Sequence, residues 1–148
     1  MNIRQPISSE AAVLAKYNRD AAREAGNPEL NKEKSEKGVL AVIKDPHKGF
    51  YLVGEKEGKI VAMILITYEW SDWRNANWYL VQSVYTLPNF RKQKYFTKLL
   101  KKVEEIAQTN KNCCGLKLEV RMDNIRAKKV YKNLGFQDFE HEVWTKNL

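Results

Sequence analysis

Residues 78–107 read WYLVQSVYTLPNFRKQKYFTKLLKKVEEIA, and this stretch decides the fold. Its first part is rich in β-branched and aromatic side chains, which favours a strand that Pro88 ends. After a short polar turn, apolar residues recur at the spacing of a helix with one buried face: Phe96, Leu99, Leu100, Val103 and Ala107. The stretch therefore predicts a strand, a turn and a helix that packs against a sheet.

The segments before this stretch predict further strands and two helices. The almost unbroken apolar run over residues 60–68 is typical of a central strand buried on both faces, and residues 49–55 predict its neighbour. Helical spacing predicts a first helix that ends at Gly26 and a weaker helix over residues 30–43. A short edge strand is expected at residues 3–5.

The segments after it predict two strands and a helix. Residues 116–121 alternate between apolar and charged side chains, which favours a strand. Asp123 or Asn124 is expected to cap a last helix that ends before Gly135, and residues 136–144 are predicted to form a final strand. The order β-α-α-β-β-β-α-β-α-β indicates an α+β domain, sandwich-like, with helices on both faces of a central sheet.

Length and composition indicate one globular domain. The chain has 148 residues, a net charge of +8 and 43% hydrophobic residues, so a single domain over residues 1–148 is expected. No apolar run approaches the roughly 20 residues of a membrane-spanning helix, and the first residues lack a signal-peptide pattern. The adjacent Cys113 and Cys114 fit free thiols, and no metal site is expected. We therefore expect a cytoplasmic protein.

The positive charge is concentrated in two short segments. Residues 91–102 carry six basic side chains and no acid, and residues 121–132 carry five basic side chains and one acid. This concentration indicates an anionic partner, either a nucleic acid or a small phosphorylated molecule. The first segment coincides with the start of the predicted helix, whose unpaired amides bind phosphate readily. The alternative for that segment is a solvated basic helix face.

Two segments resemble the motifs of one protein family. Residues 87–100, LPNFRKQKYFTKLL, resemble the acyl-CoA-binding motif of the GNAT superfamily of N-acetyltransferases, Pro-x-x-Arg-x-x-Gly-x-Gly/Ala followed by a helix with paired leucines. Residues 123–136, DNIRAKKVYKNLGF, resemble the family's Asn-x-x-Ala-x-x-x-Tyr-x-x-x-Gly-Phe segment. The resemblance implies the GNAT fold, with a mixed, mostly antiparallel sheet, over a single acetyltransferase domain. Lys94 and Phe96 stand where the first motif has glycine.

The resemblance implies that acetyl-CoA is the co-substrate, without a metal, and that an amine attacks its thioester directly. The backbone of residues 84–86 would hold the acetyl group and pantetheine arm, and amides over residues 92–97 would hold the pyrophosphate. Asn124 would contact the pantetheine, and Tyr131 would be the general acid, although Tyr131 also fits the buried stripe of its helix. The implied cofactor-binding residues are Val84, Tyr85, Thr86, Arg91, Lys92, Gln93, Lys94, Tyr95, Phe96, Thr97, Asn124 and Tyr131.

The loop over residues 68–79 is the candidate site for the acceptor amine. Its mixture of aromatic and acidic side chains suits a cation, and it resembles the Tyr-x-x-Ser-x-Trp loop of the polyamine and thialysine acetyltransferase branch. That branch has Glu-Asp where this chain has Gln82 and Ser83, so the general base is left open. Three carboxylates could act through water: Glu69, Asp72 and Glu24. The candidate substrate residues are Glu69, Trp70, Asp72, Trp73 and Gln82.

Three functions remain compatible with these features. The first is N-acetyl transfer to a small-molecule or peptide amine. The second is acyl-CoA binding with weak or no transfer, because the motif glycines and the usual carboxylate are missing. The third and weakest is nucleic-acid binding through the basic run with Tyr95 and Phe96, because Phe96 better fits a buried helix stripe. The tryptophans of the 68–79 loop would equally suit a homodimer interface.

Overall fold

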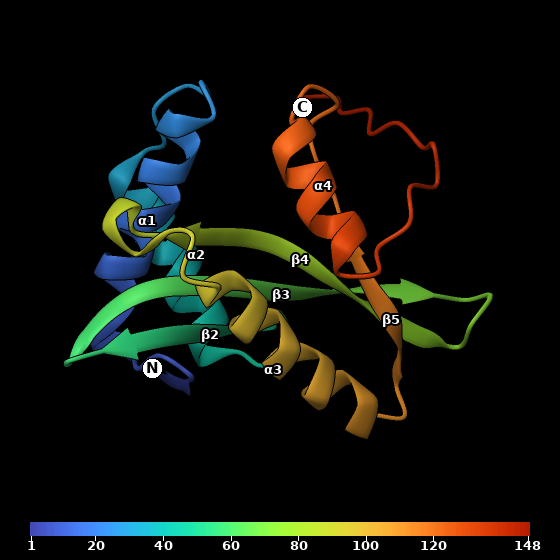
Figure 1. Ribbon diagram of the computed structural model, residues 1–148, viewed down its shortest axis with the longest axis horizontal. Coiled ribbons are helices and arrows are strands. Elements are labelled where there is room, and N and C mark those ends of the chain that lie inside the picture. The colour runs from blue at the N-terminus through green and yellow to red at the C-terminus, as the bar shows by residue number, and fades with distance from the viewer. The chain divides into compact units, whose positions relative to one another are not determined.

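Figure 1 shows the computed structural model, which describes all 148 residues. Five strands form one sheet in the order β1-β2-β3-β4-β5. Neighbours from β1 to β4 are antiparallel, whereas β5 runs parallel to β4. A parallel pair needs a crossover connection, and helix α3 provides it. The strands are β1 (Asn2–Arg4), β2 (Gly49–Lys56), β3 (Lys59–Ser71), β4 (Ala76–Thr86) and β5 (Cys113–Leu118).

The four predicted helices are confirmed, with ends within a few residues of those expected. They are α1 (Ala11–Glu24), α2 (Lys32–Lys44), α3 (Tyr95–Thr109) and α4 (Ile125–Asn133), joined by the 3₁₀ turns η1 (Ser8–Glu10) and η2 (Pro88–Phe90). Helix α2 begins after Asn31, whose side-chain oxygen accepts a hydrogen bond from the Lys34 N–H at 2.9 Å. None of the helices is both long and apolar enough to span a membrane.

Helices α1 and α2 cover one face of the sheet, and α3 covers the other (Figure 1). Side chains alternate between the two faces along each strand, so Tyr51, Val53, Met63 and Leu65 pack with α1 and α2. Every residue of β3 from Ile60 to Ile66 is buried, as predicted for a central strand. The buried side chains of α3 are Tyr95, Leu99, Leu100 and Val103.

Strand β5 differs slightly from its prediction over residues 116–121. It begins at Cys113, whose backbone already pairs with Asn77, and it ends at Leu118. The alternating pattern marks only the apolar side chains, whereas backbone pairing with β4 already begins at Cys113. Both cysteines are free thiols, as expected.

Contacts divide the chain into two compact units, residues 1–118 and residues 119–148. The second unit contains α4, which is followed by Gly135 with a left-handed φ of 88°. The rings of Tyr131 and Phe136 meet edge-on, with 6.0 Å between their centroids. The signals at both ends of this helix are therefore local ones that the sequence predicts.

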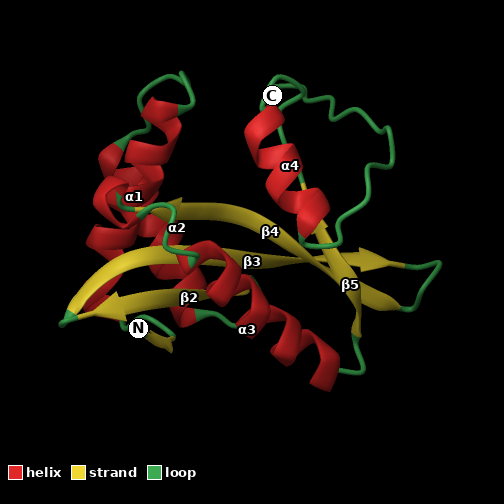
Figure 2. Cartoon of the chain, in the orientation of Figure 1, coloured by secondary structure: helices red, strands yellow, loops and turns green.

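The final strand predicted over residues 136–144 is wrong. Figure 2 shows the chain after α4 as loop, and its residues carry no strand assignment. The N–H of Glu140 bonds to the Asp138 carboxylate at 3.0 Å, and Glu140 has a left-handed φ of 55°. This local turn interrupts the extended backbone that a strand requires.

Candidate functional site

Strand β4 extends beyond β5, and part of one β4 edge is left without a strand partner. The β4–β5 ladder ends where Val81 pairs with Leu118, whereas β4 continues to Thr86. Backbone polar groups on this edge of residues 82–86 have no ladder partner from β5. Since buried backbone groups require hydrogen-bond partners, this edge is suited to binding an extended ligand.

A bulge lies at the start of this unpaired edge. On the side facing β3, Ser83 pairs with Leu65 and Val81 pairs with Ile66, so Gln82 is the extra residue. A bulge kinks a strand and changes the direction of its side chains, and bulges are common beside active sites. The sequence predicts Gln82 as a site residue but contains no signal for the bulge itself.

The loop from β4 to α3 presents backbone N–H groups at a helix start. The N–H of Lys98 bonds to the carbonyl of Lys94 at 3.0 Å, so the N–H groups of residues 95–97 have no acceptor within the helix. No side chain caps α3, and Lys92 and Lys94 are both exposed. Unpaired amides, the positive end of the helix dipole and two lysines together suit a phosphate group.

Lys92 and Lys94 both adopt the left-handed conformation, with φ of 63° and 61°. A residue with a Cβ pays roughly 1–2 kcal/mol in this conformation, whereas glycine adopts it freely. Lys94 occupies the position where the family motif has its first glycine. The backbone of this chain thus keeps the conformation that suits glycine, although the side chain is lysine.

Arg91 ties the same loop to the last residue of α1. Its Nη2 donates to both carboxylate oxygens of Glu24 at 2.8 Å, and its Nε donates to the Thr86 carbonyl at 3.0 Å. The Tyr85 hydroxyl donates to the Glu24 carboxylate at 3.2 Å. Burial raises the pKa of Tyr85, and the Glu24 carboxylate raises it further. Two predicted cofactor residues, Arg91 and Tyr85, therefore use their side chains to hold the loop and α1 together.

In the first turn of α3, backbone N–H groups are more available to a ligand than the side chains are. The Gln93 Nε2 donates to the Asn89 carbonyl at 3.1 Å, within the loop. The Tyr95 ring is buried and meets the Phe90 ring edge-on, with centroids 6.0 Å apart. Two half-buried side chains complete the turn: Phe96 and Thr97. A buried Tyr95 cannot stack on a base, which removes one argument for nucleic-acid binding.

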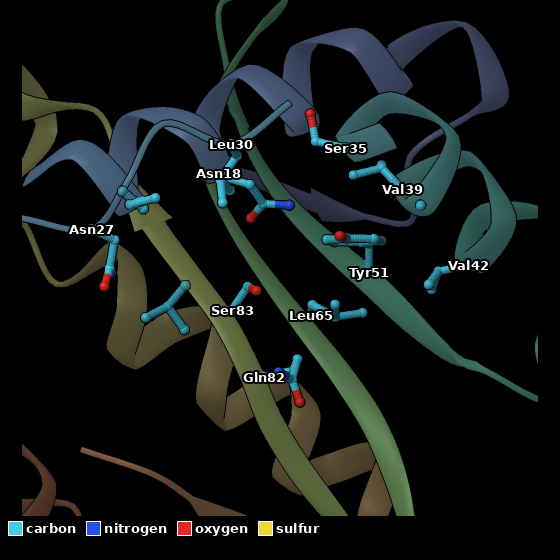
Figure 3. A pocket seen from close by; sticks show the side chains of 14 residues that line it. Asn18, Asn27, Leu30, Ser35, Val39, Val42, Tyr51, Leu65, Gln82 and Ser83 are labelled. Carbon is cyan, nitrogen blue, oxygen red and sulfur yellow. The ribbon is translucent and has the colours of Figure 1, made fainter. Parts of the chain in front are cut away.

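A cavity of about 590 Å³ lies between α1, α2 and strands β2 to β4, and Figure 3 shows its lining. A volume of this size accommodates a small molecule. Two of the predicted site residues, Gln82 and Val84, line it from the part of β4 that extends beyond β5. The cavity therefore adjoins the unpaired edge of β4, within the first unit.

The other four predicted acceptor residues lie near the far end of the β3–β4 hairpin. Trp70 and Trp73 are 59% and 95% exposed. Glu69 pairs with Lys117 at 2.6 Å, and the Asp72 carboxylate accepts a hydrogen bond from the Trp73 N–H at 2.9 Å. The Glu69 pair joins β3 to β5, since Lys117 belongs to β5, and neither contact involves the cavity.

The hairpin end and the cavity are separate surfaces of the first unit. Ser83 lines the cavity, and Ala76 is the first residue of β4 at the hairpin end. The strand between them is about 23 Å long at roughly 3.3 Å per residue. Figure 1 shows the hairpin extending beyond α1, α2 and α3. Gln82 is therefore separated from the tryptophans with which the sequence grouped it.

In the second unit, Asn124 and Tyr131 lie on α4 and its N-cap. The Asn124 side-chain oxygen accepts a hydrogen bond from the Ala127 N–H at 3.0 Å, as expected for an N-cap. Tyr131 is half-buried, and burial raises its pKa above the usual 10.0. A raised pKa keeps the phenol protonated at neutral pH, which a general acid requires.

Sequence reasoning missed the polar residues that α1 and α2 contribute to the cavity. Asn18 and Ser35 line it from these helices, and Asn27 lines it from the loop between them. A signal was present, since Ser35 shares one helix face with the cavity-lining Val39 and Val42. A polar residue within an apolar stripe marks a place where the stripe does not meet the core.

Comparison with known proteins gives concordant matches. The acetyltransferase (GNAT) family model matches residues 14–136. The thialysine N-epsilon-acetyltransferase of Mus musculus is 40% identical over 93 residues, which are 62% of this chain and 54% of the mouse protein. The matched part thus spans about half the length of that relative.

Two solved structures are similar over almost the whole chain. A possible acetyltransferase from Clostridium difficile 630 is 34% identical, with a TM-score of 0.91 over 99% of this chain and 97% of that one. The structure of AAC(6')-Iy in complex with a CoA-containing bisubstrate analogue has a TM-score of 0.81 over 99% of this chain and 97% of that one. At 15% identity, the second likeness shows the fold alone.

Proposed function

Because this chain belongs to the GNAT acetyltransferase family, we propose that it transfers an acetyl group from acetyl-CoA to a primary amine of a small molecule or peptide. The observation that carries the proposal is the end of β4, where an unpaired backbone edge leads into the amides at the start of α3. The mouse relative is named for acetylation of an amine, and AAC(6')-Iy was solved with a CoA-containing analogue. Both relatives support the same chemistry.

The residues at the end of β4 fit coenzyme A. A pyrophosphate requires N–H donors and positive charge, which the N–H groups of residues 95–97 and the exposed Lys92 and Lys94 provide. A pantetheine arm carries amide groups, and the edge of residues 82–86, apart from the Thr86 carbonyl that Arg91 already binds, can bind them as it would bind another strand. When bound, acetyl-CoA supplies an acyl group activated as a thioester.

We assign Tyr131 the role of general acid and Asn124 that of a cofactor contact. The burial that raises the pKa of Tyr131 keeps its proton in place until a thiolate leaves. The resemblance of residues 123–136 to the family segment supports both roles, and the raised pKa supports that of Tyr131.

The attacking amine must give up a proton, and the cavity offers no carboxylate to accept it. No Asp or Glu lines the cavity. Of the carboxylates considered from sequence, Glu24 is bound by Arg91 and Glu69 is bound by Lys117. We therefore propose that water near Gln82 takes the proton, with no side chain acting as a direct base.

The variant Tyr131→Phe tests the general acid. We expect its kcat to fall by roughly 100- to 10,000-fold, the usual contribution of a general acid, while its Kd for CoA changes little. Tyr68→Phe is the matched control, because burial also raises the pKa of Tyr68, which lies outside the cavity and outside both cofactor segments. Unchanged turnover of Tyr131→Phe across the pH range would show that another group is the acid.

A second candidate function is acyl-CoA binding with weak transfer, which the strained Lys94 at the glycine position favours. Calorimetry with CoA and an acetylation assay on an amine panel separate the two. Binding without acetylation of any amine would favour this second function. The homodimer and the cytoplasmic location stay predictions from sequence.

A further inference from the structure

The cavity between α1, α2 and β4 has an uncharged lining. Its polar side chains are amides and hydroxyls: Asn18, Asn27, Ser35, Tyr51, Gln82 and Ser83. No Asp, Glu, Lys, Arg or His lines it. Figure 3 shows the labelled polar groups around the same space as the apolar side chains of Leu30, Val39, Val42 and Leu65. The space thus offers hydrogen bonds and apolar contact without a countercharge.

All four carboxylates of the two helices that border the cavity are used in ion pairs. Asp20 pairs with Lys16 and Arg23, and Glu24 pairs with Arg91. The corresponding pairs of α2 are Glu33 with Lys37 and Glu36 with Arg19. Each carboxylate of α1 and α2 therefore already has a cationic partner.

The amide side chains have capacity for a ligand. Burial raises the pKa of the Tyr51 hydroxyl, and the neighbouring Asn18 side chain lowers it by a smaller amount. Gln82 is exposed at the bulge, and its side chain has one long contact, 3.5 Å to the Thr67 hydroxyl. An amide carries both donors and acceptors, so these groups can bind a hydroxyl or an amide of a ligand.

From this lining we infer that the acceptor is a primary amine whose remaining body is uncharged and carries a hydroxyl or amide group, and that polyamines are excluded. The inference deepens the proposed function and rests on it. A second ammonium group keeps its charge near neutral pH, and moving it out of water without a carboxylate partner is unfavourable. The reacting amine benefits from the same uncharged surroundings, because desolvation favours its neutral, nucleophilic form.

The matched probes are 4-amino-1-butanol and 1,4-diaminobutane, which have the same length and differ at one end. Each is titrated into the ¹⁵N-labelled full chain saturated with CoA, and amide shifts are followed at Ser35, Gly38 and Ser83. We expect the amino alcohol to shift these amides with a Kd at least tenfold below that of the diamine. Equal or tighter binding of the diamine, or shifts confined to the tryptophans of the hairpin end, overturns the inference.

Two variants sharpen the test. Gln82→Glu places one carboxylate at an exposed position of the lining, and it should reverse the preference between the two probes. Gly38→Phe places a ring on the helix face that carries Ser35 and Val42, and it should abolish amino-alcohol binding while CoA still binds. An unchanged preference in Gln82→Glu contradicts the inference even if Gly38→Phe does not fold.

Acetylation assays with acetyl-CoA keep the two proposals distinguishable. If the amino alcohol binds in the cavity but is not acetylated, the cavity inference stands and the transferase function fails. If an amine is acetylated without any shift at the cavity amides, the transferase function stands and the cavity inference fails.

Discussion

At the scale of single residues, Lys94 shows how a side chain and its backbone can favour different residues. The left-handed φ of 61° is the conformation of a glycine, yet the side chain adds positive charge to a loop that suits phosphate. The loop at the start of α3 thus has a backbone conformation that suits glycine, with a lysine side chain on it. The cost of the Cβ can be measured directly.

We predict that Lys94→Gly raises the free energy of unfolding by about 0.5–1 kcal/mol. The relief of left-handed strain exceeds the extra chain entropy that glycine adds to the unfolded state. Chemical denaturation measures this change. Lys94→Ala is the control: it removes the same charge but keeps a Cβ, so its stability should match that of the unchanged protein. A gain of the same size in both variants would attribute the effect to charge.

At the scale of elements, two glycines near the cavity have the same room for a side chain but different backbone conformations. Gly38 lies within α2 and Gly26 follows α1, and a Cβ added at either would meet nothing within 4 Å. Gly26 has a left-handed φ of 73°, whereas Gly38 has no such angle. Alanine at these two positions therefore tests the effect of backbone conformation, because the added methyl group has free space at both.

We predict opposite effects for alanine at these two glycines. Gly38→Ala should raise the free energy of unfolding by about 0.5–1 kcal/mol, because glycine weakens a helix interior. Gly26→Ala should lower it by about 1 kcal/mol, because alanine is strained at positive φ. Thermal and urea unfolding of both variants check the signs. A loss of stability in Gly38→Ala would mean that the face of α2 at the cavity does not tolerate a methyl group.

The N-terminal elements β1 and η1 are joined to β2 through one arginine. Arg4 donates to Glu10 at 2.7 Å and to Glu55 at 2.6 Å. The hydrogen bond from Arg4 is the main reason why the pKa of Glu10 lies below the usual 4.5. A lowered carboxyl pKa adds stability above the unfolded-state pKa, and this stability is lost as the pH falls through the folded-state pKa.

We therefore predict that Glu10→Gln costs about 1 kcal/mol of unfolding free energy at pH 7, in the range of a part-buried charged hydrogen bond. The difference from the unchanged protein should shrink as the pH falls below about 4.5. Urea unfolding at a series of pH values measures it. Glu33→Gln is a suitable control, because its ion pair with Lys37 is largely exposed and should contribute little. A difference that persists at pH 2 would contradict the linkage.

At the scale of the whole molecule, burial is very unequal between the two units. The first unit contains the buried core of α1, α3 and β2 to β4, whereas α4 has no fully buried side chain. Local stability follows buried apolar contact, so the units should open with different free energies. The two segments that resemble the family motifs belong to different units, residues 87–100 to the first and residues 123–136 to the second.

We predict that backbone amides of residues 119–148 exchange with deuterium orders of magnitude faster than those of β3. Saturating CoA should slow exchange at residues 95–97 and over α4, because the proposed function uses both. Hydrogen-exchange mass spectrometry with and without CoA tests this. Protection at the start of α3 but none over residues 119–136 would support the phosphate site in the loop and contradict the role of Asn124 as a cofactor contact.

The sequence alone predicted most elements, because their signals are local. Helical periodicity in α3, the apolar run of β3 and the capping residues Asn124 and Gly135 depend on neighbours along the chain. The basic segments and the family motifs were visible for the same reason. The strand expected over residues 136–144 failed, since apolar alternation does not reveal a turn at Glu140.

The site depended on contacts between residues that are distant in sequence. Arg91 meets Glu24 across 67 positions, and β5 stops at Leu118 while β4 continues. Gln82 was grouped with nearby tryptophans by sequence, but the bulge places it in the lining of a cavity together with Asn18. No local pattern encodes such a cavity, because its walls come from two helices and three strands. Folding alone brings these walls together, and none of the residues that line the cavity is charged.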